Sequence, residues 1–193
     1  MKKVSLIKKG ILGSTFALGV AMAGGNALST VQAEEAVITQ EGVEVVEEDE
    51  SIEVLNAVSG EWTYNVSGGK ATSTKYSGTD TTLQIPETLD GYTVNVIGAS
   101  AFKESDITEI VFPDTIEKIE SYAFYKCTYL TNVSWSDGLT FIGECAFNQC
   151  TGLGEVLLPE GLKTISESAF GYNNITKLSI PSTVTKIGYY AFQ

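Results

Sequence analysis

The sequence predicts a mainly β repeat solenoid, in which short parallel strands stack into a right-handed coil. Two observations lead to this fold: a dipeptide that recurs at nearly constant intervals, and apolar columns that recur with it. Ala-Phe returns at intervals of 22, 23, 23 and 22 residues, at 101–102, 123–124, 146–147, 169–170 and 191–192. A fixed period of about 20 to 50 residues indicates structural units that stack and share one core.

Each copy contains the pattern of one short strand followed by a return across the core. Ile110 and Phe112 are two residues apart, as on the buried face of a strand, and Pro113 ends the strand because it has no N–H to donate. The Ala-Phe that follows predicts a tight bend or a single helical turn, so the fold would contain short helical or 3-10 turns. The aligned apolar columns are Ile110, Val133, Val156 and Leu178; Phe112, Trp135, Leu158 and Ile180; and Ile119, Ile142, Ile165 and Ile187.

Residues 1–33 have the features of a signal peptide. Four lysines precede an apolar run over 11–28, and Val31-Gln32-Ala33 follows as a cleavage motif. An uncleaved membrane anchor is the alternative, because the run approaches the length that spans a bilayer. Several glycines within the run favour cleavage. We therefore expect a secreted or cell-surface protein that is not inserted in the membrane after cleavage.

Two further segments precede the repeats. Residues 34–58 predict an acidic disordered spacer, since the stretch to residue 55 has nine acidic residues and no lysine. Residues 59–80 predict a β-hairpin in front of the repeats. Alternating apolar and polar residues over 61–66 and a threonine-rich stretch over 70–76 flank the turn Ser67-Gly68-Gly69.

Residues 81–193 comprise five repeats, and the last one ends in mid-repeat at Gln193. We expect the natural chain to continue there; the alternatives are that this end pairs with another molecule or frays. One copy reads Ile107-x-x-Ile110-x-Phe112-Pro113-x-x-Ile116-x-x-Ile119-x-x-x-Ala123-Phe124-x-x-Cys127. This unit resembles the BspA-like class of bacterial leucine-rich repeats. The resemblance implies a leucine-rich-repeat coil with the hairpin of residues 59–80 as its N-terminal cap, since Glu61 to Tyr76 resembles the entry cap of such arrays. It also implies a secreted or cell-surface location, and a role in adhesion and protein binding without catalytic residues.

The composition excludes several function classes. All 12 basic residues are lysines and there is no histidine, so neither a Ser-His-Asp site, an imidazole metal ligand nor a guanidinium clamp can exist. We expect no enzyme, no cofactor and no metal site. Loss of the four leader lysines changes the net charge from −12 to −16. Such a charge repels the phosphates of nucleic acid, which is therefore not an expected partner.

Three cysteines are an odd number for an exported chain. Cys127 and Cys150 occupy the same column in neighbouring repeats, and a strand spacing of about 4.7–4.9 Å falls within the Cα separation of a disulfide. Two buried free thiols are the favoured interpretation, and a Cys127–Cys150 disulfide is the alternative. Cys145 lies in a column without an apolar pattern, and no cationic histidine or arginine is available to activate it.

The outward strand positions are the predicted ligand face, because strands of successive repeats align into one sheet. These positions are Glu109, Val111, Asn132, Ser134, Glu155, Leu157, Lys177 and Ser179. Tyrosines that flank the Ala-Phe bends are a second group of candidate contact residues: Tyr122, Tyr125, Tyr129, Tyr172, Tyr189 and Tyr190.

Taken with the resemblance, these features predict a secreted or cell-surface, non-enzymatic and monomeric module for protein interaction or adhesion. Its solenoid face would bind an extracellular protein or glycan. The alternative is a structural spacer or stalk within a longer surface protein.

The leader generates a prediction about export. Cleavage after Ala33 should leave a mature protein that begins at Glu34 and is found outside the cytoplasm. N-terminal mass spectrometry of the culture fluid and cell-wall fractions measures this directly. An intact Met1 on a cytoplasmic protein would contradict the assignment.

Overall fold

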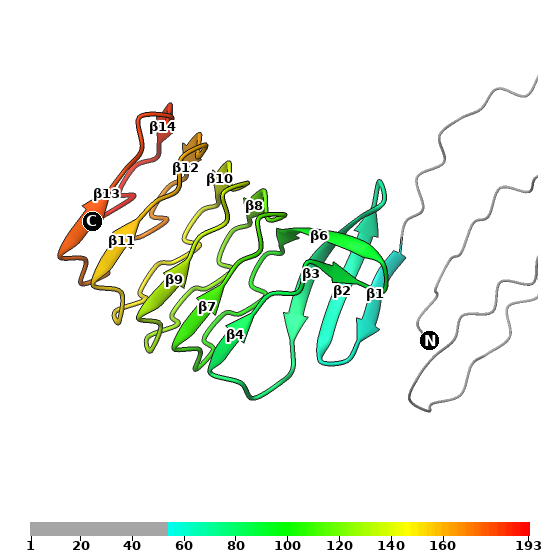
Figure 1. The fold of residues 1–193 in the computed structure, drawn as a ribbon. Coiled ribbons are helices and arrows are strands. Elements are labelled where there is room, and N and C mark those ends of the chain that lie inside the picture. Colours follow the sequence, from blue (N-terminus) through cyan, green and yellow to red (C-terminus); the bar gives the residue numbers. More distant parts are fainter. Residues whose placement is uncertain (1–53) are drawn as a thin grey trace, which may run out of the picture. The chain divides into compact units, whose positions relative to one another are not determined.

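The computed structural model describes residues 54–193, which form an elongated coil of β-strands joined by turns (Figure 1). The predicted solenoid of parallel strands is confirmed. The predicted signal peptide, 1–33, and residues 34–53 of the predicted spacer lie outside the described residues. Within residues 54–193, no helix is long and apolar enough to cross a membrane.

A three-stranded antiparallel sheet precedes the coils. Its strands are β1 (Val54–Ser59), β2 (Trp62–Ser67) and β3 (Lys70–Tyr76). The predicted hairpin corresponds to β2 and β3, whose turn has both Gly68 and Gly69 at positive φ, the conformation that tight hairpin turns need. The predicted disordered spacer, 34–58, is wrong at its C-terminal end, because residues 54–58 belong to strand β1. The sequence pattern missed this strand because Leu55 and Val58 are 60% and 62% exposed, so β1 forms by main-chain pairing rather than by burial.

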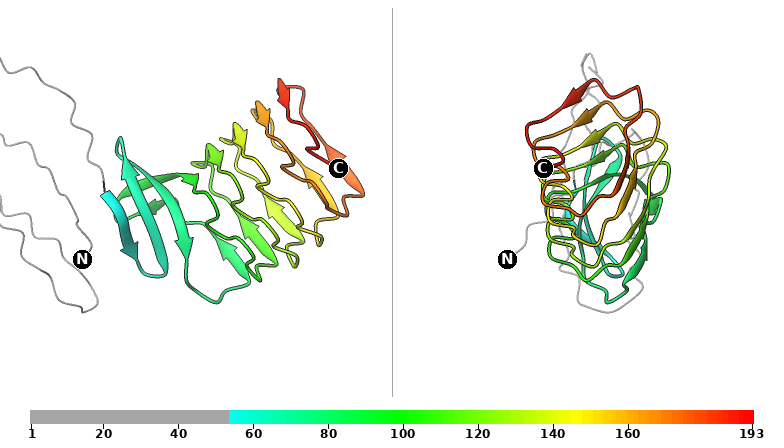
Figure 2. Two further views of the ribbon diagram at one scale, coloured as in Figure 1. Left: turned by 180° about the vertical axis from the view of Figure 1, so that it is seen from behind. Right: turned by 90° about the vertical axis from the view of Figure 1, so that its left-hand side faces the viewer.

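Five coils follow, and each contributes one strand to each of two sides (Figures 1 and 2). The first side holds β4 (Thr82–Gln84), β7 (Glu109–Val111), β9 (Asn132–Ser134), β11 (Glu155–Leu157) and β13 (Lys177–Ser179). The second side holds β6 (Tyr92–Ile97), β8 (Lys118–Ile119), β10 (Phe141–Ile142), β12 (Thr164–Ile165) and β14 (Lys186–Ile187). The short strand β5 (Thr88–Leu89) pairs antiparallel with β6 and accounts for the longer first copy.

The N-terminal sheet and the coils share one continuous sheet, in the order β1-β2-β3-β6-β8-β10-β12-β14. Strand β3 pairs parallel with β6, and the last two residues of β6 pair with β8. The ion pair between Lys70 Nζ and Glu117 Oε1, 2.7 Å apart, lies at the same junction. The first three strands therefore cap the coil by extending its hydrogen-bond ladder.

The bends around Ala-Phe consist of consecutive tight turns. This is the first of the two predicted alternatives, a tight bend, and the predicted helical or 3-10 turn is wrong. In the second coil, Tyr122 and Lys126 have φ of 60° and 59°, in the left-handed region. The N–H groups of Tyr122, Phe124 and Lys126 donate to carbonyl groups of the next coil, while the residues between them bond within their own turn. A helix would direct every N–H group into its own segment. The alternating pattern thus creates a third ladder between coils, at a conformational cost of about 1 kcal/mol or more per left-handed residue.

Aromatic rings stack along the centre of the coil. The rings of Phe102, Phe124, Phe147, Phe170 and Phe192 follow one another with centroid separations of 5.0, 4.9, 5.3 and 5.4 Å and interplanar angles of 3° to 7°. Trp62 and Tyr76 of the cap pack against Phe102 at 6.1 and 6.4 Å and so cover the first ring. Fully buried Ile, Leu and Ala side chains of every middle coil surround the stack.

The stack predicts a large cost for removing one ring. Phe147→Ala should lower the free energy of unfolding by about 3–5 kcal/mol, because Phe147 is fully buried between two rings. Gln149→Ala is the matched control in the same bend. Its side chain is half-buried and makes one hydrogen bond, to the Tyr125 hydroxyl, so the cost should be about 1 kcal/mol or less. Urea denaturation measures both values; equal midpoints would contradict the packing described.

Candidate functional site

The strand register brings the predicted ligand-face residues into two outward columns. Glu109 is paired with Asn132 and Val111 with Ser134, while Glu155 is paired with Lys177 and Leu157 with Ser179. Thr82 and Gln84 of β4 precede them in the same two columns. All of these side chains are exposed or half-buried, because alternate residues of the strands point inward. We refer to this surface, formed by the outward residues of β4, β7, β9, β11 and β13, as the strand face.

Polar contacts on the strand face run between neighbouring coils. The side-chain amide of Asn132 donates to Glu109 Oε1 at 2.8 Å, and Lys177 Nζ lies 2.5 Å from Glu155 Oε1. Both pairs are solvent-exposed, so each contributes little to stability. Leu157 is 45% exposed beside these polar groups. An apolar side chain held among exposed hydrogen-bonding groups is a combination that protein interfaces use.

The strand face is divided between the third and fourth coils. Strands β4, β7 and β9 form one ladder and β11 and β13 form another, and in residues 54–193 no strand pairing joins β9 to β11. Trp135 follows β9 at a position that holds a smaller side chain in the other copies. Its indole packs inward against Phe147 and Phe170, with centroids 5.3 and 6.2 Å apart. This indole therefore lies directly beside the gap between the two ladders.

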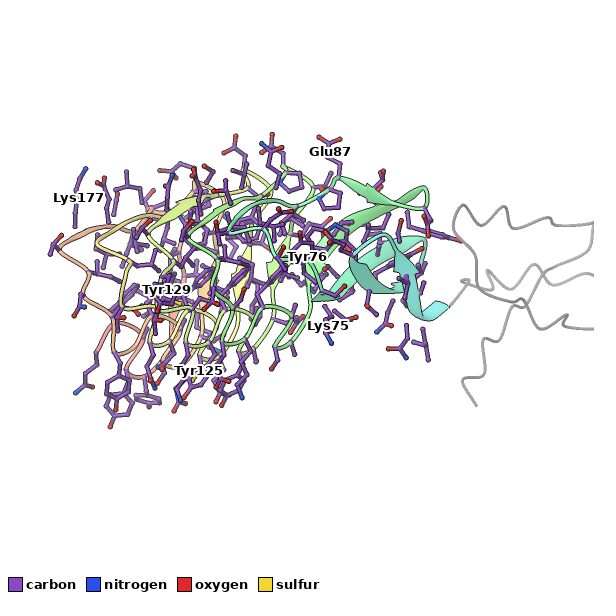
Figure 3. The ribbon with its side chains drawn as sticks, turned by 90° about the horizontal axis from the view of Figure 1, so that it is seen from below. Lys75, Tyr76, Glu87, Tyr125, Tyr129 and Lys177 are labelled. Atoms are coloured by element: carbon purple, nitrogen blue, oxygen red, sulfur yellow. The ribbon has the colours of Figure 1, made fainter. Side chains whose placement is uncertain are left out.

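The tyrosines lie along the bends, on a different side of the coil from the strand face. Figure 3 shows Tyr125 and Lys177 projecting from opposite sides. The Tyr122 and Tyr125 rings meet edge to face at 5.6 Å, and Lys126 Nζ lies 5.3 Å from the Tyr125 centroid. The hydrogen bond from Tyr122 to Glu144 raises the pKa of Tyr122 to about 12, so this hydroxyl is neutral at physiological pH. Tyr129, Tyr172, Tyr189 and Tyr190 are exposed.

Cys127 and Cys150 are free thiols in this structure, and no disulfide joins them. Both are fully buried, and their Sγ atoms donate to the carbonyl oxygens of Phe102 and Phe124, each at 3.0 Å. Contact with the Cys127 thiol, together with burial, raises the pKa of Cys150. The favoured interpretation of the sequence, two buried thiols in one column, describes this arrangement.

Residues 54–193 contain no group of three or more acidic or cysteine side chains placed to hold a metal ion. Cys145 is partly exposed. Burial and the nearby carboxylates of Glu144 and Glu167 raise the pKa of this thiol, and the hydrogen bond with Tyr122 opposes them only in part. A raised pKa lowers the thiolate fraction at neutral pH, which is the reverse of what a nucleophilic cysteine requires.

The sequence did not predict a groove at the junction of the cap and the first coil. The groove has a volume of about 510 Å³ and is lined by Glu61, Trp62, Tyr76, Asp80, Thr82, Leu83 and Gln84. Its acidic residues lie on two separate turns, 61 and 80, and no motif connects them. Only the pairing of β2 with β3 and the fold of the following loop onto the cap bring them together.

Comparisons with known proteins agree with the architecture. A model of the BspA type leucine rich repeat region matches residues 76–193 in six copies. A leucine-rich repeat protein of T. pallidum superposes with a TM-score of 0.68 at 25% identity, covering 72% of this chain and 66% of its own. A leucine-rich repeat protein of Bacteroides ovatus superposes with a TM-score of 0.65 at 33% identity, covering 71% of this chain and 38% of its own. A leucine-rich repeat protein of Bacteroides capillosus superposes with a TM-score of 0.51 at 28% identity, covering 69% of this chain and 96% of its own.

The chain thus spans about two thirds of the T. pallidum protein and well under half of the B. ovatus protein. A search of curated proteins found no match.

The cysteine environments predict selective and pH-dependent alkylation. In the folded protein, iodoacetamide should modify Cys145 alone, because Cys127 and Cys150 are fully buried. The raised pKa of Cys145 means that its rate at pH 7 should be lower than that of an unstructured thiol and should still be rising with pH where the rate of the unstructured thiol has levelled off. Mass spectrometry of the modified peptides measures this, and the protein in denaturant, where all three should react, is the control. Rapid modification of Cys127 or Cys150 under native conditions would contradict the burial described.

Proposed function

The chain belongs to the BspA-type leucine-rich repeat family, and from this membership we propose that it is a non-enzymatic interaction module that acts outside the cell or at its surface. We propose further that the strand face binds an extracellular protein or glycan in adhesion. The predicted signal peptide supports the location. The absence of histidine and arginine supports a binding role over hydrolysis, because common hydrolytic sites use those residues.

The exposure of the strand face is the observation that carries the assignment of the ligand site. Its outward side chains take no part in the core, which is built from the inward residues of the same strands. The face therefore tolerates side chains chosen for binding, as the concave surfaces of other solenoids do. Leu157 contributes apolar area, while Glu109, Asn132 and Glu155 contribute hydrogen-bonding groups of fixed spacing.

The charge of the protein limits the class of partner. With the net charge of −12, and −16 after the proposed cleavage, an acidic polymer such as nucleic acid would be repelled. A protein with a basic surface or a neutral glycan fits this charge. The second candidate function is a spacer or stalk within a longer surface protein. An elongated coil whose outward side chains are mostly small and polar would also suit that role.

Capture of extracellular matrix proteins and cell-wall glycans on the immobilised protein tests the proposal. The wild-type protein should retain at least one specific ligand, and Leu157→Ala should weaken its retention about fivefold or more, as truncation of a central contact does. Tyr189→Ala is the control, because Tyr189 is 81% exposed in the bend of the last coil, outside the strand face.

Each other outcome has a defined meaning. Specific capture that depends on Tyr189 but not on Leu157 would assign binding to the bends and contradict the strand face. No specific capture from either material would favour the spacer. Circular dichroism should give equal melting temperatures for all three proteins, since neither side chain belongs to the core.

A further inference from the structure

The groove between the cap and the first coil contains an unusual arrangement of oxygen atoms. The Tyr76 hydroxyl lies 2.7 Å from Asp80 Oδ2 and 3.0 Å from Glu61 Oε2. Partial burial, with the hydrogen bonds to Asp80 and Glu61, raises the pKa of Tyr76, so the phenol keeps its proton at neutral pH. Figure 3 shows Tyr76 at the boundary between the cap and the coils.

One proton serves two carboxylates in this arrangement. A phenol donates a single hydrogen bond, so only one of the two contacts can be a good one when both acids are ionised. In the other contact, a carboxylate oxygen lies close to the phenol oxygen without a proton between them. The negative charges of the Glu61 and Asp80 carboxylates also repel each other. No lysine of residues 54–193 forms an ion pair with Glu61 or Asp80. The ion pairs in this part of the chain join lysines to Glu117 and Glu155 instead. A cation with several N–H donors would satisfy both acids.

Aromatic rings border the same groove. Trp62 and Tyr76 lie with ring centroids 4.7 Å apart at an angle of 44°, and Trp62 is half-buried. Trp is the side chain whose ring face attracts cations most strongly. Gly78 packs directly against the inner side of the Tyr76–Glu61 pair, since a methyl group at that position would overlap the Tyr76 hydroxyl and the Glu61 carboxylate.

The groove is continuous with the strand face. Thr82 and Gln84 line it, and both belong to the outward columns of β4, the first strand of that face. A partner that lies along the strand face would therefore reach the groove with a side chain from the same surface. This position makes the groove the end of one extended binding surface.

We infer that the groove binds a lysine or arginine side chain of a protein partner, with the cationic group at the Glu61 and Asp80 carboxylate oxygens that do not contact Tyr76 and its aliphatic part against Trp62. This inference rests on the proposed binding function and specifies the chemistry of the partner. Two carboxylates without lysine partners and an aromatic wall complement a cation with an apolar stem. Arginine and lysine side chains have both parts.

Titration of the purified protein with blocked tripeptides tests the inference by NMR. The probes are acetyl-Gly-Lys-Gly-amide, acetyl-Gly-Arg-Gly-amide and, as the neutral control, acetyl-Gly-Gln-Gly-amide. The protein has two tryptophans, so the indole N–H resonance of Trp62 reports on the groove and that of Trp135, half-buried against Phe147 and outside the groove lining, is an internal reference. The basic peptides should shift the Trp62 signal alone, and this shift should decrease at high salt because the site is exposed.

Charge-neutral variants identify the residues that bind. Glu61→Gln and Asp80→Asn should each weaken binding of the basic peptides about two- to fivefold, as expected for exposed ion pairs. The double variant should bind the lysine and glutamine peptides equally. Glu160→Gln, an exposed acid of the fourth coil, should change nothing. Equal melting temperatures would show that the variants remain folded.

Two results would overturn the inference. One is a Trp62 shift of equal size with the glutamine peptide, which would indicate a site for neutral ligands such as glycans. The other is retention of basic peptide binding by the double variant. Neither result affects the proposed function, whose test depends on Leu157 and on captured ligands. Conversely, capture of a ligand that depends on Leu157 but not on Glu61 or Asp80 would support the strand face and reject the groove.

Discussion

Stacking of one phenylalanine from every coil is the interaction on which the rest of this structure depends. The ring centroids are 4.9–5.4 Å apart and the rings are parallel within 7°, close to the spacing of about 4.7–4.9 Å between hydrogen-bonded strands. Rings and ladders can therefore repeat together without strain, provided that every coil has nearly the same length. This requirement explains why Ala-Phe returns every 22 or 23 residues and why the one extra segment leaves the coil as the β5 excursion.

The same requirement accounts for the strained backbone of the bends. To place Phe124 in the stack while donating hydrogen bonds to the next coil, the chain adopts left-handed conformations at Tyr122 and Lys126. A β-carbon is unfavourable there, and the cost is offset by a complete ladder of hydrogen bonds and a buried ring. At one end, Trp62 and Tyr76 cover the stack and shield Phe102 from solvent. These cap residues also line the groove, so one pair of aromatic side chains serves stability and forms the proposed cation site.

Because the core uses only inward side chains, the outer surface is free to carry recognition. The strand face and the groove lie on one continuous surface that begins at β4, and both are acidic or polar with limited apolar area. Such a surface suits a partner with basic side chains that lies along the coil. The tyrosine-lined bends are a separate surface, on the opposite side in Figure 3. Trp135 lies beside the one gap in the strand face of residues 54–193, where its half-buried indole packs inward against Phe147 and no pairing joins β9 to β11.

The sequence alone determined the repeat, the strand positions and the outward columns of the strands, because a period of 22–23 residues allows only one register in which like side chains meet. The inward burial of Ile110, Ile142 and Phe147 followed from that register. Three features required the tertiary structure. Strand β1 has no buried pattern and exists through main-chain pairing with β2. The bends use left-handed residues that have no distinctive composition, so the sequence did not decide between a tight bend and a helical turn. The groove depends on Glu61 and Asp80, which are distant in the chain, and only the folding of the cap brings their carboxylates to one hydroxyl.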